Sequence, residues 1–225
     1  MKISIIIPAL NEEGYLEKTL SHTLKLKGNF EIIVVDGGST DHTQAIAEGF
    51  NPVQTLVAGK GRANQMNHGA LHAKGEIFLF LHADTVLPQN VYQEITGQLR
   101  KPGHIGGSFR LRFDKYHPFL NLYSWCSRFN LEYFTYGDHA IFVKKEIYNL
   151  IGGFKSIPFM EDIEIQKRLR KKGKFKKLKS YVLTSGRRFE KNGIKYQLLL
   201  DVFLIFLYNF RVAPRTLKRF YKDHA

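Results

Sequence analysis

Continuous apolar runs separated by mixed stretches dominate the first hundred residues. Residues 5–7, 32–35 and 77–81 are such runs, and each is typical of a strand buried on both faces of a parallel sheet. The pattern predicts strands at 3–7, 31–35, 53–57 and 76–81. They alternate with helices near 12–26, near 42–49 and near 89–100, and with one that ends near residue 73. This alternation predicts right-handed crossovers and parallel strands.

The pattern after about residue 104 is mixed. It predicts a strand near 105–113, antiparallel at the edge of the same sheet, and another at 139–143. Helices are expected near 118–131 and 144–151, and a further helix starts near Glu161 and runs into a basic segment. The chain has no repeat or obvious linker, so residues 1–225 are predicted to form one α/β domain with helices on both faces of a mostly parallel sheet.

Polar residues follow three of the apolar runs directly. Asn11 and Glu12 follow the first, Asp36 ends the second, and Asp84 comes shortly after the third. In open α/β sheets, ligands bind beyond the carboxyl ends of the strands, so we expect these side chains to share one site. Carboxylates at the strand ends indicate binding of a metal ion and of a ribose. A metal ion and a ribose in one site indicate a bound nucleotide.

Composition and charge narrow the class of protein. The net charge is +14, and residues 167–177 form a dense basic run, which either binds anions or is a solvated helix face. A nucleic-acid binder is less favoured, because the basic residues are not interleaved with aromatics in a recognisable module. The single cysteine, Cys126, allows no intramolecular disulfide, which fits a reducing cytoplasm. The first apolar run is too short for a signal peptide, since Pro8 ends it.

Residues 194–212 form a second strongly apolar segment, interrupted by Asp201, Asn209 and Arg211. The segment is shorter than the roughly 20 apolar residues that span a bilayer. It predicts either a helix buried in the core or an interfacial helix beside a basic surface, and the pattern alone leaves both open.

Four motifs occur in a fixed order along the chain. They are Pro8-Ala9-Leu10-Asn11-Glu12-Glu13, Val35-Asp36-Gly37-Gly38-Ser39-Thr40-Asp41, His82-Ala83-Asp84 and Met160-Glu161-Asp162. This order resembles that of inverting family-2 glycosyltransferases with the GT-A fold, and it is most similar to small single-domain bacterial members. The resemblance implies a Rossmann-like nucleotide-binding domain, and we expect residues 1–103 to hold the donor and 104–193 to face the acceptor. Residues 194–225 are expected to be helical, with the core and membrane-surface alternatives both open.

The resemblance implies a nucleoside diphosphate sugar as donor, linked to uridine or guanosine, with contacts from both βα loops. The donor-binding candidates are Pro8, Ala9, Asn11, Glu12, Asp36, Gly38, Arg62, Asp84, Arg187 and Arg188. Purely local roles remain open for several of them. Asp36 suits a turn, Asn11 a helix cap, and the three arginines suit surface charge. Two adjacent guanidiniums, Arg187 and Arg188, could also clamp a diphosphate.

A divalent metal, Mn²⁺ or Mg²⁺, is the implied cofactor. The family usually carries Asp-X-Asp where this chain has His82-Ala83-Asp84, so Asp84 is the predicted ligand and the first acid is missing. In an extended segment His82 points the same way as Asp84, which makes it a second candidate ligand. An imidazole would shift preference from Mg²⁺ toward Mn²⁺; alternatively, His82 packs on the core.

The implied chemistry is a single displacement with a carboxylate as general base. The family pattern makes Asp162 the base and Glu161 the runner-up, although both could simply complement the dipole of the helix they begin. Asp138 and Tyr136 are expected on the acceptor side.

Two alternatives to a metal-assisted glycosyltransferase remain open. One is a nucleotidyltransferase, although the loop after the first strand has no glycine before Gly14. The other is a catalytically weak membrane-surface protein that binds nucleotide sugars. The apolar segment and the basic surface point to a lipid-linked acceptor, contact with an anionic membrane, and a cytoplasmic location on its inner face.

Overall fold

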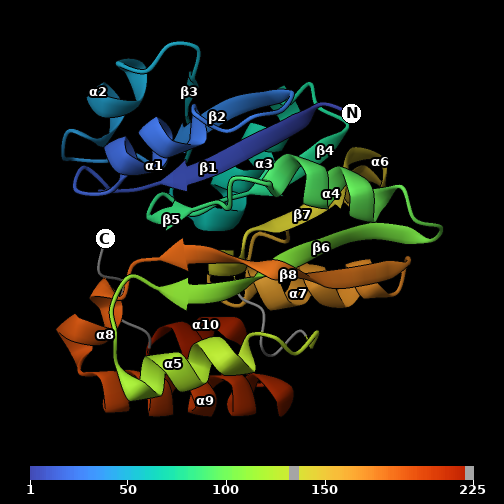
Figure 1. The fold of residues 1–225 in the computed structure, drawn as a ribbon. Helices are drawn as coiled ribbons and strands as arrows, with labels where there is room; N and C mark the ends of the chain where they lie inside the picture. Colours follow the sequence, from blue (N-terminus) through green and yellow to red (C-terminus); the bar gives the residue numbers. More distant parts are fainter. Residues whose placement is uncertain (132–136, 221–225) are drawn as a thin grey trace.

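The computed structural model describes residues 1–131 and 137–220, which form one mixed sheet with helices on both faces (Figure 1). The sheet has eight strands in the order β3-β2-β1-β4-β7-β6-β8-β5. Their bounds are β1 Ile3–Ala9, β2 Phe30–Asp36, β3 Gln54–Val57, β4 Ile77–Phe80, β5 Thr85–Val86, β6 His104–Phe113, β7 Ile141–Lys144 and β8 Lys174–Thr184.

The predicted parallel half of the sheet is confirmed. Strands β1, β2, β3 and β4 pair in parallel, with Ile3 opposite Phe30 at the start of β1 and Ala9 opposite Asp36 at its end. The ends of β1 and β2 therefore lie side by side, as the sequence pattern predicted. Three connecting helices are shorter than expected: α1 Leu16–Thr23, α2 Thr43–Glu48 and α4 Val91–Leu99. Helix α3, Arg62–His72, ends close to the predicted position.

The predicted position of the 105–113 strand is wrong. Strand β6 pairs antiparallel with β7, but it lies inside the sheet, because β8 pairs with its other side in parallel. The sequence analysis missed β8, since its residues continue the basic run and alternate apolar with charged side chains. The helix that begins at Glu161 ends at Arg170, and the rest of the basic run turns and enters β8.

The remaining helices belong to the second half of the chain. They are α5 Pro118–Cys126, η2 Gly137–His139, a 3₁₀ turn where a strand was expected to begin, α6 Lys145–Leu150, α7 Glu161–Arg170, α8 Arg187–Asn192, α9 Ile194–Asn209 and α10 Pro214–Lys218. Figure 1 shows α5, α8, α9 and α10 gathered at one end of the molecule, beyond β8. The sequence pattern did not predict α8, a helix of only six residues.

Two apolar cores lie on opposite faces of the sheet, because successive strand residues point to opposite sides. Ile3, Ile5 and Ile7 of β1 belong to one core with residues of α1, α2 and α4, whereas Ile6 belongs to the other with residues of α3, α6 and α7. A third, smaller cluster joins α7, α9 and α10 through Met160, Ile163, Leu204 and Leu217. With both faces covered, the polar groups at the strand ends are left at one edge of the sheet.

Candidate active site

Hydrogen bonds join the loop after β1 to the loop after β2. The backbone N–H of Asn11 donates to Ser39 Oγ at 2.9 Å, and Asn11 Oδ1 accepts from the N–H of Thr40 at 2.9 Å. The N–H of Glu12 donates to Thr43 Oγ1 at 2.7 Å. Asn11 does not cap α1, whose N-cap is Tyr15. It sits at φ +53°, a conformation that asparagine tolerates better than most residues, and there it links the two loops.

Asp36 shapes the loop that follows β2. Its Oδ2 accepts from the N–H groups of Gly38 and Ser39, both at 2.9 Å, and its Oδ1 accepts from Ser39 Oγ. Gly38 has φ +88°, which favours glycine at this position. The side chain of Asp36 therefore has the local turn role that was the alternative to nucleoside contact, and the nucleoside contact stays a prediction.

Gln65 of α3 also fastens the strand ends, and the sequence analysis missed it. Its Nε2 donates to the carbonyl of Ala9 at 2.6 Å and to that of Val35 at 3.0 Å. Gln65 is buried, as are Pro8 and Ala9 at the end of β1. The sequence shows a glutamine within the predicted helix, but its burial could be inferred only by knowing which face of α3 is covered.

Arg187, at the start of α8, connects two predicted site carboxylates. Its Nη2 lies 2.5 Å from Glu12 Oε1 and 3.4 Å from Asp84 Oδ2. The guanidinium also stacks over the ring of Tyr15, 4.3 Å from the ring centroid. Burial raises the pKa of Glu12 above its ordinary value, and the hydrogen bond and charge of Arg187 oppose that rise. The donor half and the second half of the chain thus meet at one charged cluster.

Asp84 and His82 are the side chains predicted to bind a divalent metal. Asp84 Oδ1 lies 3.3 Å from the hydroxyl of Thr85, and its carboxylate is 13% exposed. Two buried atoms nearby, Glu12 Oε2 and His82 Nε2, have no hydrogen-bond partner among the described residues. No cluster of three His, Cys, Asp or Glu side chains within residues 1–131 and 137–220 could hold an ion. Asp84 therefore fits a metal that takes its other ligands from a diphosphate and water, as Mg²⁺ usually does.

His82 is a neutral imidazole in these surroundings. Burial lowers the pKa of His82 well below its ordinary value, and the positive charges of Arg62, Arg188 and Arg187 lower it further. A neutral ring nitrogen can accept a hydrogen bond or bind a metal. Its role as a ligand stays a prediction.

Glu161 and Asp162 open α7 and face a small pocket. The pocket is lined by Arg62, His82, Glu161 and Asp162 together with Met66, Phe80, Ile141 and Phe154. Arg62 Nη1 donates to Glu161 Oε1 at 3.3 Å. The two acids are 5% and 7% exposed. Four polar residues predicted from three separate segments are therefore brought to one cavity.

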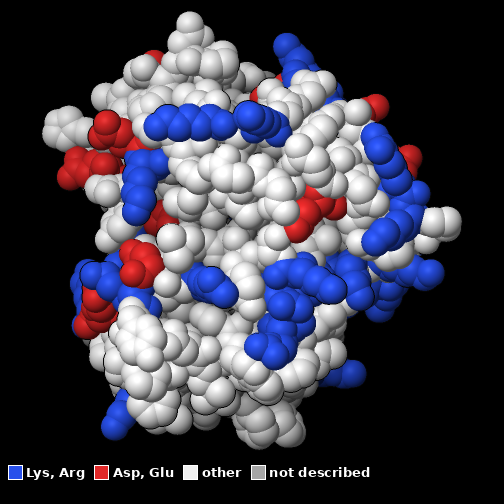
Figure 2. Space-filling view, viewed as in Figure 1, with Lys and Arg blue, Asp and Glu red and all other residues white. Residues whose placement is uncertain are grey.

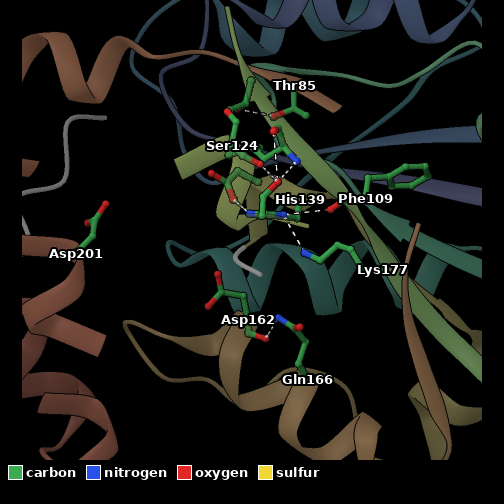
Figure 3. Close-up of polar contacts among 12 residues, drawn as sticks. Thr85, Phe109, Ser124, His139, Asp162, Gln166, Lys177 and Asp201 are labelled. Atoms are coloured by element: carbon green, nitrogen blue, oxygen red, sulfur yellow. Dashed lines mark hydrogen bonds and ion pairs between the residues drawn. The ribbon is translucent and has the colours of Figure 1, made fainter. Parts of the chain in front are cut away.

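Asp162 is held in place through its backbone as well as its helix position. Its carbonyl accepts from Gln166 Nε2 at 3.1 Å, and its Oδ1 accepts from the N–H of Ile163 at 2.8 Å. Figure 3 shows the Asp162 carboxylate pointing away from its Gln166 contact. The first turn of a helix favours the ionised carboxylate, which is the form that a general base requires.

Asp138, His139 and Lys177 form a polar row that the sequence analysis missed in part, and Figure 3 shows the contact between His139 and Lys177. His139 Nδ1 lies 3.1 Å from Lys177 Nζ and 3.1 Å from the carbonyl of Phe109, and His139 Nε2 lies 3.7 Å from Asp138 Oδ1. A single ring nitrogen either donates or accepts, so only one of the two Nδ1 contacts is a hydrogen bond at a time. Lys177 is only 5% exposed, so this part of the basic run is not a solvated face.

Burial changes the proton affinity of all three groups in the row. It lowers the pKa values of Lys177 and His139 well below their ordinary values. It raises the pKa of Asp138 to about 6, against the attraction of Arg188. Asp138 Oδ1 has no hydrogen-bond partner among the residues that the structure describes. Tyr136, the other acceptor-side candidate, lies outside the described residues.

Arg188 does not share the partners of Arg187. Its Nη2 lies 3.0 Å from Asp201 Oδ2 on α9, whereas Arg187 reaches Glu12 and Asp84. Adjacent residues on a helix point in different directions. Among the described residues, Arg187 is therefore the member of the pair that lies against the donor carboxylates, and the two-arginine clamp stays a prediction.

Solved structures with similar folds come from two glycosyltransferases. The mannosyltransferase PcManGT of Pyrobaculum calidifontis, in complex with GDP-Man and Mn²⁺, has a TM-score of 0.65 at 20% identity, covering 80% of this chain and 56% of that one. TarS of S. aureus, in complex with UDP-GlcNAc, has a TM-score of 0.65 at 19% identity, covering 82% and 58%. The predicted GT-A fold is confirmed.

Sequence comparison points to the same class. The dolichol-phosphate mannosyltransferase of Pyrococcus furiosus is 32% identical over 112 residues, which are 47% of this chain and 32% of that protein. The chain spans about a third of the length of the first curated relatives that it matches. The family model "Glycosyl transferase family 2" matches residues 4–162. This match includes every predicted motif from Pro8 to Asp162, and the chain belongs to glycosyl transferase family 2.

Proposed function

We propose that this chain transfers a hexose from a uridine- or guanosine-linked nucleoside diphosphate sugar to an acceptor hydroxyl, with inversion and with the help of a divalent metal. The observation that carries the proposal is the contact of Arg187 with both Glu12 and Asp84. It joins the two predicted donor loops to a cation that suits a diphosphate. The two structural relatives were solved with GDP-Man and UDP-GlcNAc.

The joined loops after β1 and β2 would bind the nucleoside. Asn11, Glu12 and Asp36 offer side-chain oxygens at this edge, and the backbone of Pro8, Ala9 and Gly38 shapes it. Their mutual hydrogen bonds hold the loops in place before the donor arrives, which reduces the entropy lost on binding.

Asp84 would hold the metal, with His82 beside it. When bound, the ion would supply a Lewis acid that neutralises the leaving diphosphate. Arg187 and Arg62 add positive charge from α8 and α3. Mn²⁺ in the PcManGT complex supports a metal of this kind.

Asp162 would act as the general base from the other half of the molecule. The acceptor oxygen forms a bond to the anomeric carbon while Asp162 takes its proton. The bond between that carbon and the diphosphate breaks, and its electron pair leaves with the diphosphate. Asp162 suits this role because it lines the pocket beside Arg62 and His82. Glu161 is the runner-up, but it already accepts from Arg62.

The acceptor is the least constrained part of the proposal. We favour a hydroxyl on a lipid-linked acceptor, with Asp138 on its side of the site. The similarity to the P. furiosus dolichol-phosphate mannosyltransferase supports a lipid-linked acceptor.

Calorimetric titration of UDP and GDP, with and without Mn²⁺, tests the donor and metal sites together. Wild type should bind one nucleotide in a metal-dependent manner, and Asp84→Asn should weaken that binding by about tenfold or more, because the metal loses its protein ligand. Glu146→Gln, at a carboxylate that is 73% exposed, is the matched control and should bind as wild type does. Equal binding by Asp84→Asn, or binding that ignores the metal, would contradict the metal site.

A further inference from the structure

Helix α9 buries Leu204 against α7 and α10 but leaves a broad apolar face exposed, while two of its polar side chains point inward. Gln197 is 1% exposed and Asp201 is 12% exposed at its side chain, whereas Leu199, Val202 and Phe206 are 72%, 64% and 56% exposed. A surface helix of a globular protein normally shows the reverse arrangement, with its apolar stripe facing the core. The segment is therefore a helix, as predicted, and it is buried on one face only.

The inward polar residues are fully engaged, which accounts for the helix orientation. Asp201 ion-pairs with Arg188 of α8 at 3.0 Å and accepts from Gln197 at 2.7 Å. Gln197 in turn accepts from Asn192 at 2.6 Å. These bonds would be lost if α9 rotated to bury its leucines and phenylalanines. The outward apolar face is thus part of the native packing.

Helix α5 extends this apolar face. It lies against α9 (Figure 1), and Phe119, Leu122 and Trp125 on it are 40%, 57% and 48% exposed. In Figure 2, drawn from the same side, the end of the molecule that carries these helices is largely white, with blue side chains around it. The α5–α9 surface is defined as the exposed side chains Phe119, Leu122, Trp125, Leu199, Val202, Phe203, Phe206 and Phe210. Contiguous exposed apolar area of this kind marks an interaction site.

The charges around the α5–α9 surface are mostly positive, although Asp114 and Glu190 adjoin it and Lys115 pairs with Glu190 at 3.4 Å. Residues 191–220 contain six lysines and arginines and one acid, Asp201, which is paired inward. Residues 115–131 contain Lys115 and Arg128 and no acid. Arg128 lies over the ring of Trp125, 4.7 Å from its centroid. Long basic side chains beside aromatic rings can lie along an apolar surface with their charges at its rim, as an anionic membrane surface requires.

We propose that the α5–α9 surface docks the protein on an anionic phospholipid bilayer. The apolar side chains would enter the boundary between headgroups and acyl chains, and the surrounding cations would meet lipid phosphates. A second copy of the chain fits less well, because two such faces would bring like charges together. No helix within residues 1–131 and 137–220 is long and apolar enough to cross a membrane, so α9 would lie on the bilayer.

Docking would place the candidate active site close to the membrane. Helix α8 is the connection: Arg188 binds Asp201 of α9, and its neighbour Arg187 binds Glu12 and Asp84. The docking surface itself rests on the side chains of α5 and α9 and does not require the proposed transfer reaction. A lipid-linked acceptor would nonetheless be presented at this end of the molecule.

Flotation with vesicles tests the proposal directly. Wild type should float with vesicles of phosphatidylcholine and phosphatidylglycerol and stay behind with phosphatidylcholine alone. The triple variant Leu199→Gln/Val202→Gln/Phe206→Gln should lower the partition coefficient by about tenfold or more, since it removes apolar surface that the bilayer would bury. Leu71→Gln/Leu150→Gln makes the same chemical change at side chains that are 81% and 65% exposed elsewhere, and it should float as wild type does.

Two further measurements separate the outcomes. Thermal unfolding and the nucleotide titration show whether each variant is folded, so lost flotation in a folded variant supports docking even if transfer is never observed. A wild type that does not float with anionic vesicles, or a triple variant that floats equally well, would overturn the proposal. Light scattering tests the alternative that the face joins two copies of the chain. A dimeric wild type and a monomeric triple variant, neither of which floats, would support that alternative and overturn the proposal.

Discussion

The two halves of the molecule hold their polar groups in different ways. In residues 1–103, backbone and side-chain amide groups of neighbouring loops form hydrogen bonds with one another, as the Thr40 N–H does with Asn11 Oδ1. In residues 104–220, ionisable side chains are buried together, as Lys177 and His139 are. The first arrangement costs little and fixes the loops, whereas buried ionisable groups are costly and concentrate at functional sites. Buried ionisable groups also occur in the first half, at Glu12 and His82, and both lie beside residues of the second half. We therefore expect the loops of the first half mainly to bind, and the second half to supply the chemistry where the two halves meet.

If the second half supplies the chemistry, Asp162→Asn should affect turnover far more than binding. We expect transfer to fall by roughly 10²–10⁴-fold, because the acceptor proton loses its base. Nucleotide affinity should stay within about twofold of wild type, since the amide keeps the shape of the side chain. The check is initial transfer rate beside calorimetry. Glu161→Gln is the neighbouring control, and a larger loss there would move the base to Glu161.

The cost of burying charge in the second half should be visible at Asp138. Its pKa is raised from the model-compound value of 3.8 to about 6, so the folded state binds more protons than the unfolded state between these values. Stability is therefore lost as pH rises through this window, and ionised Asp138 destabilises the protein at pH 7. Asp138→Asn should raise the free energy of unfolding at pH 7 by at most about 3 kcal/mol.

Urea unfolding between pH 4 and pH 8 measures this effect. The advantage of Asp138→Asn over wild type should grow with pH and level off above pH 6, while Glu146→Gln should show no such trend. A variant that is less stable than wild type at pH 7 would show that Asp138 is stabilising as a carboxylate. Reduced transfer by the more stable variant would support its place on the acceptor side.

Variants of Arg187 and Arg188 distinguish two roles of α8. Arg187 contacts the donor carboxylates, whereas Arg188 pairs with Asp201 of α9. Arg187→Met should weaken nucleotide binding by about tenfold, because a charge-assisted contact to the diphosphate is lost. Arg188→Met should leave nucleotide affinity unchanged but lower the free energy of unfolding by roughly 1–3 kcal/mol, since buried Asp201 loses its partner. Calorimetry and urea unfolding on both variants give the test. If the two variants weaken nucleotide binding equally, the prediction that both arginines clamp the diphosphate would be supported.

The smallest change is expected in the loop contacts of the first half. Asn11→Gly keeps the positive φ but removes the side-chain bonds to Thr40, and it should lower stability by about 0.5–1.5 kcal/mol. Asn11→Ala should cost about 1 kcal/mol more, because a Cβ is strained in the left-handed region. Thermal unfolding resolves the pair. Identical stability of the two variants would mean that the backbone conformation at Asn11 carries no cost.

The regular first half was well predicted from the sequence because its signals are local. A continuous apolar run sets the strand, and the next polar residue marks its end, as Asp36 does for β2. The second half was predicted less well. Strand β8 alternates lysines with apolar residues, and its lysines include one that is buried, Lys177. Residue type alone cannot reveal such burial, because it depends on the partners supplied by β6 and η2.

The sequence by itself determined the strands of the parallel half, the polar residues at their ends and the family motifs from Pro8 to Asp162. Backbone periodicity and residue order encode these features, so no knowledge of distant contacts is needed. Tertiary structure alone decided that Arg187 reaches Glu12 across 175 positions, that Lys177 is buried and that α9 faces its apolar side outward. Helix α9 is apolar nearly all round, so its pattern marks no inner face. The pairing of Asp201 with Arg188 orients it, and that pairing exists only once α8 and α9 are packed together.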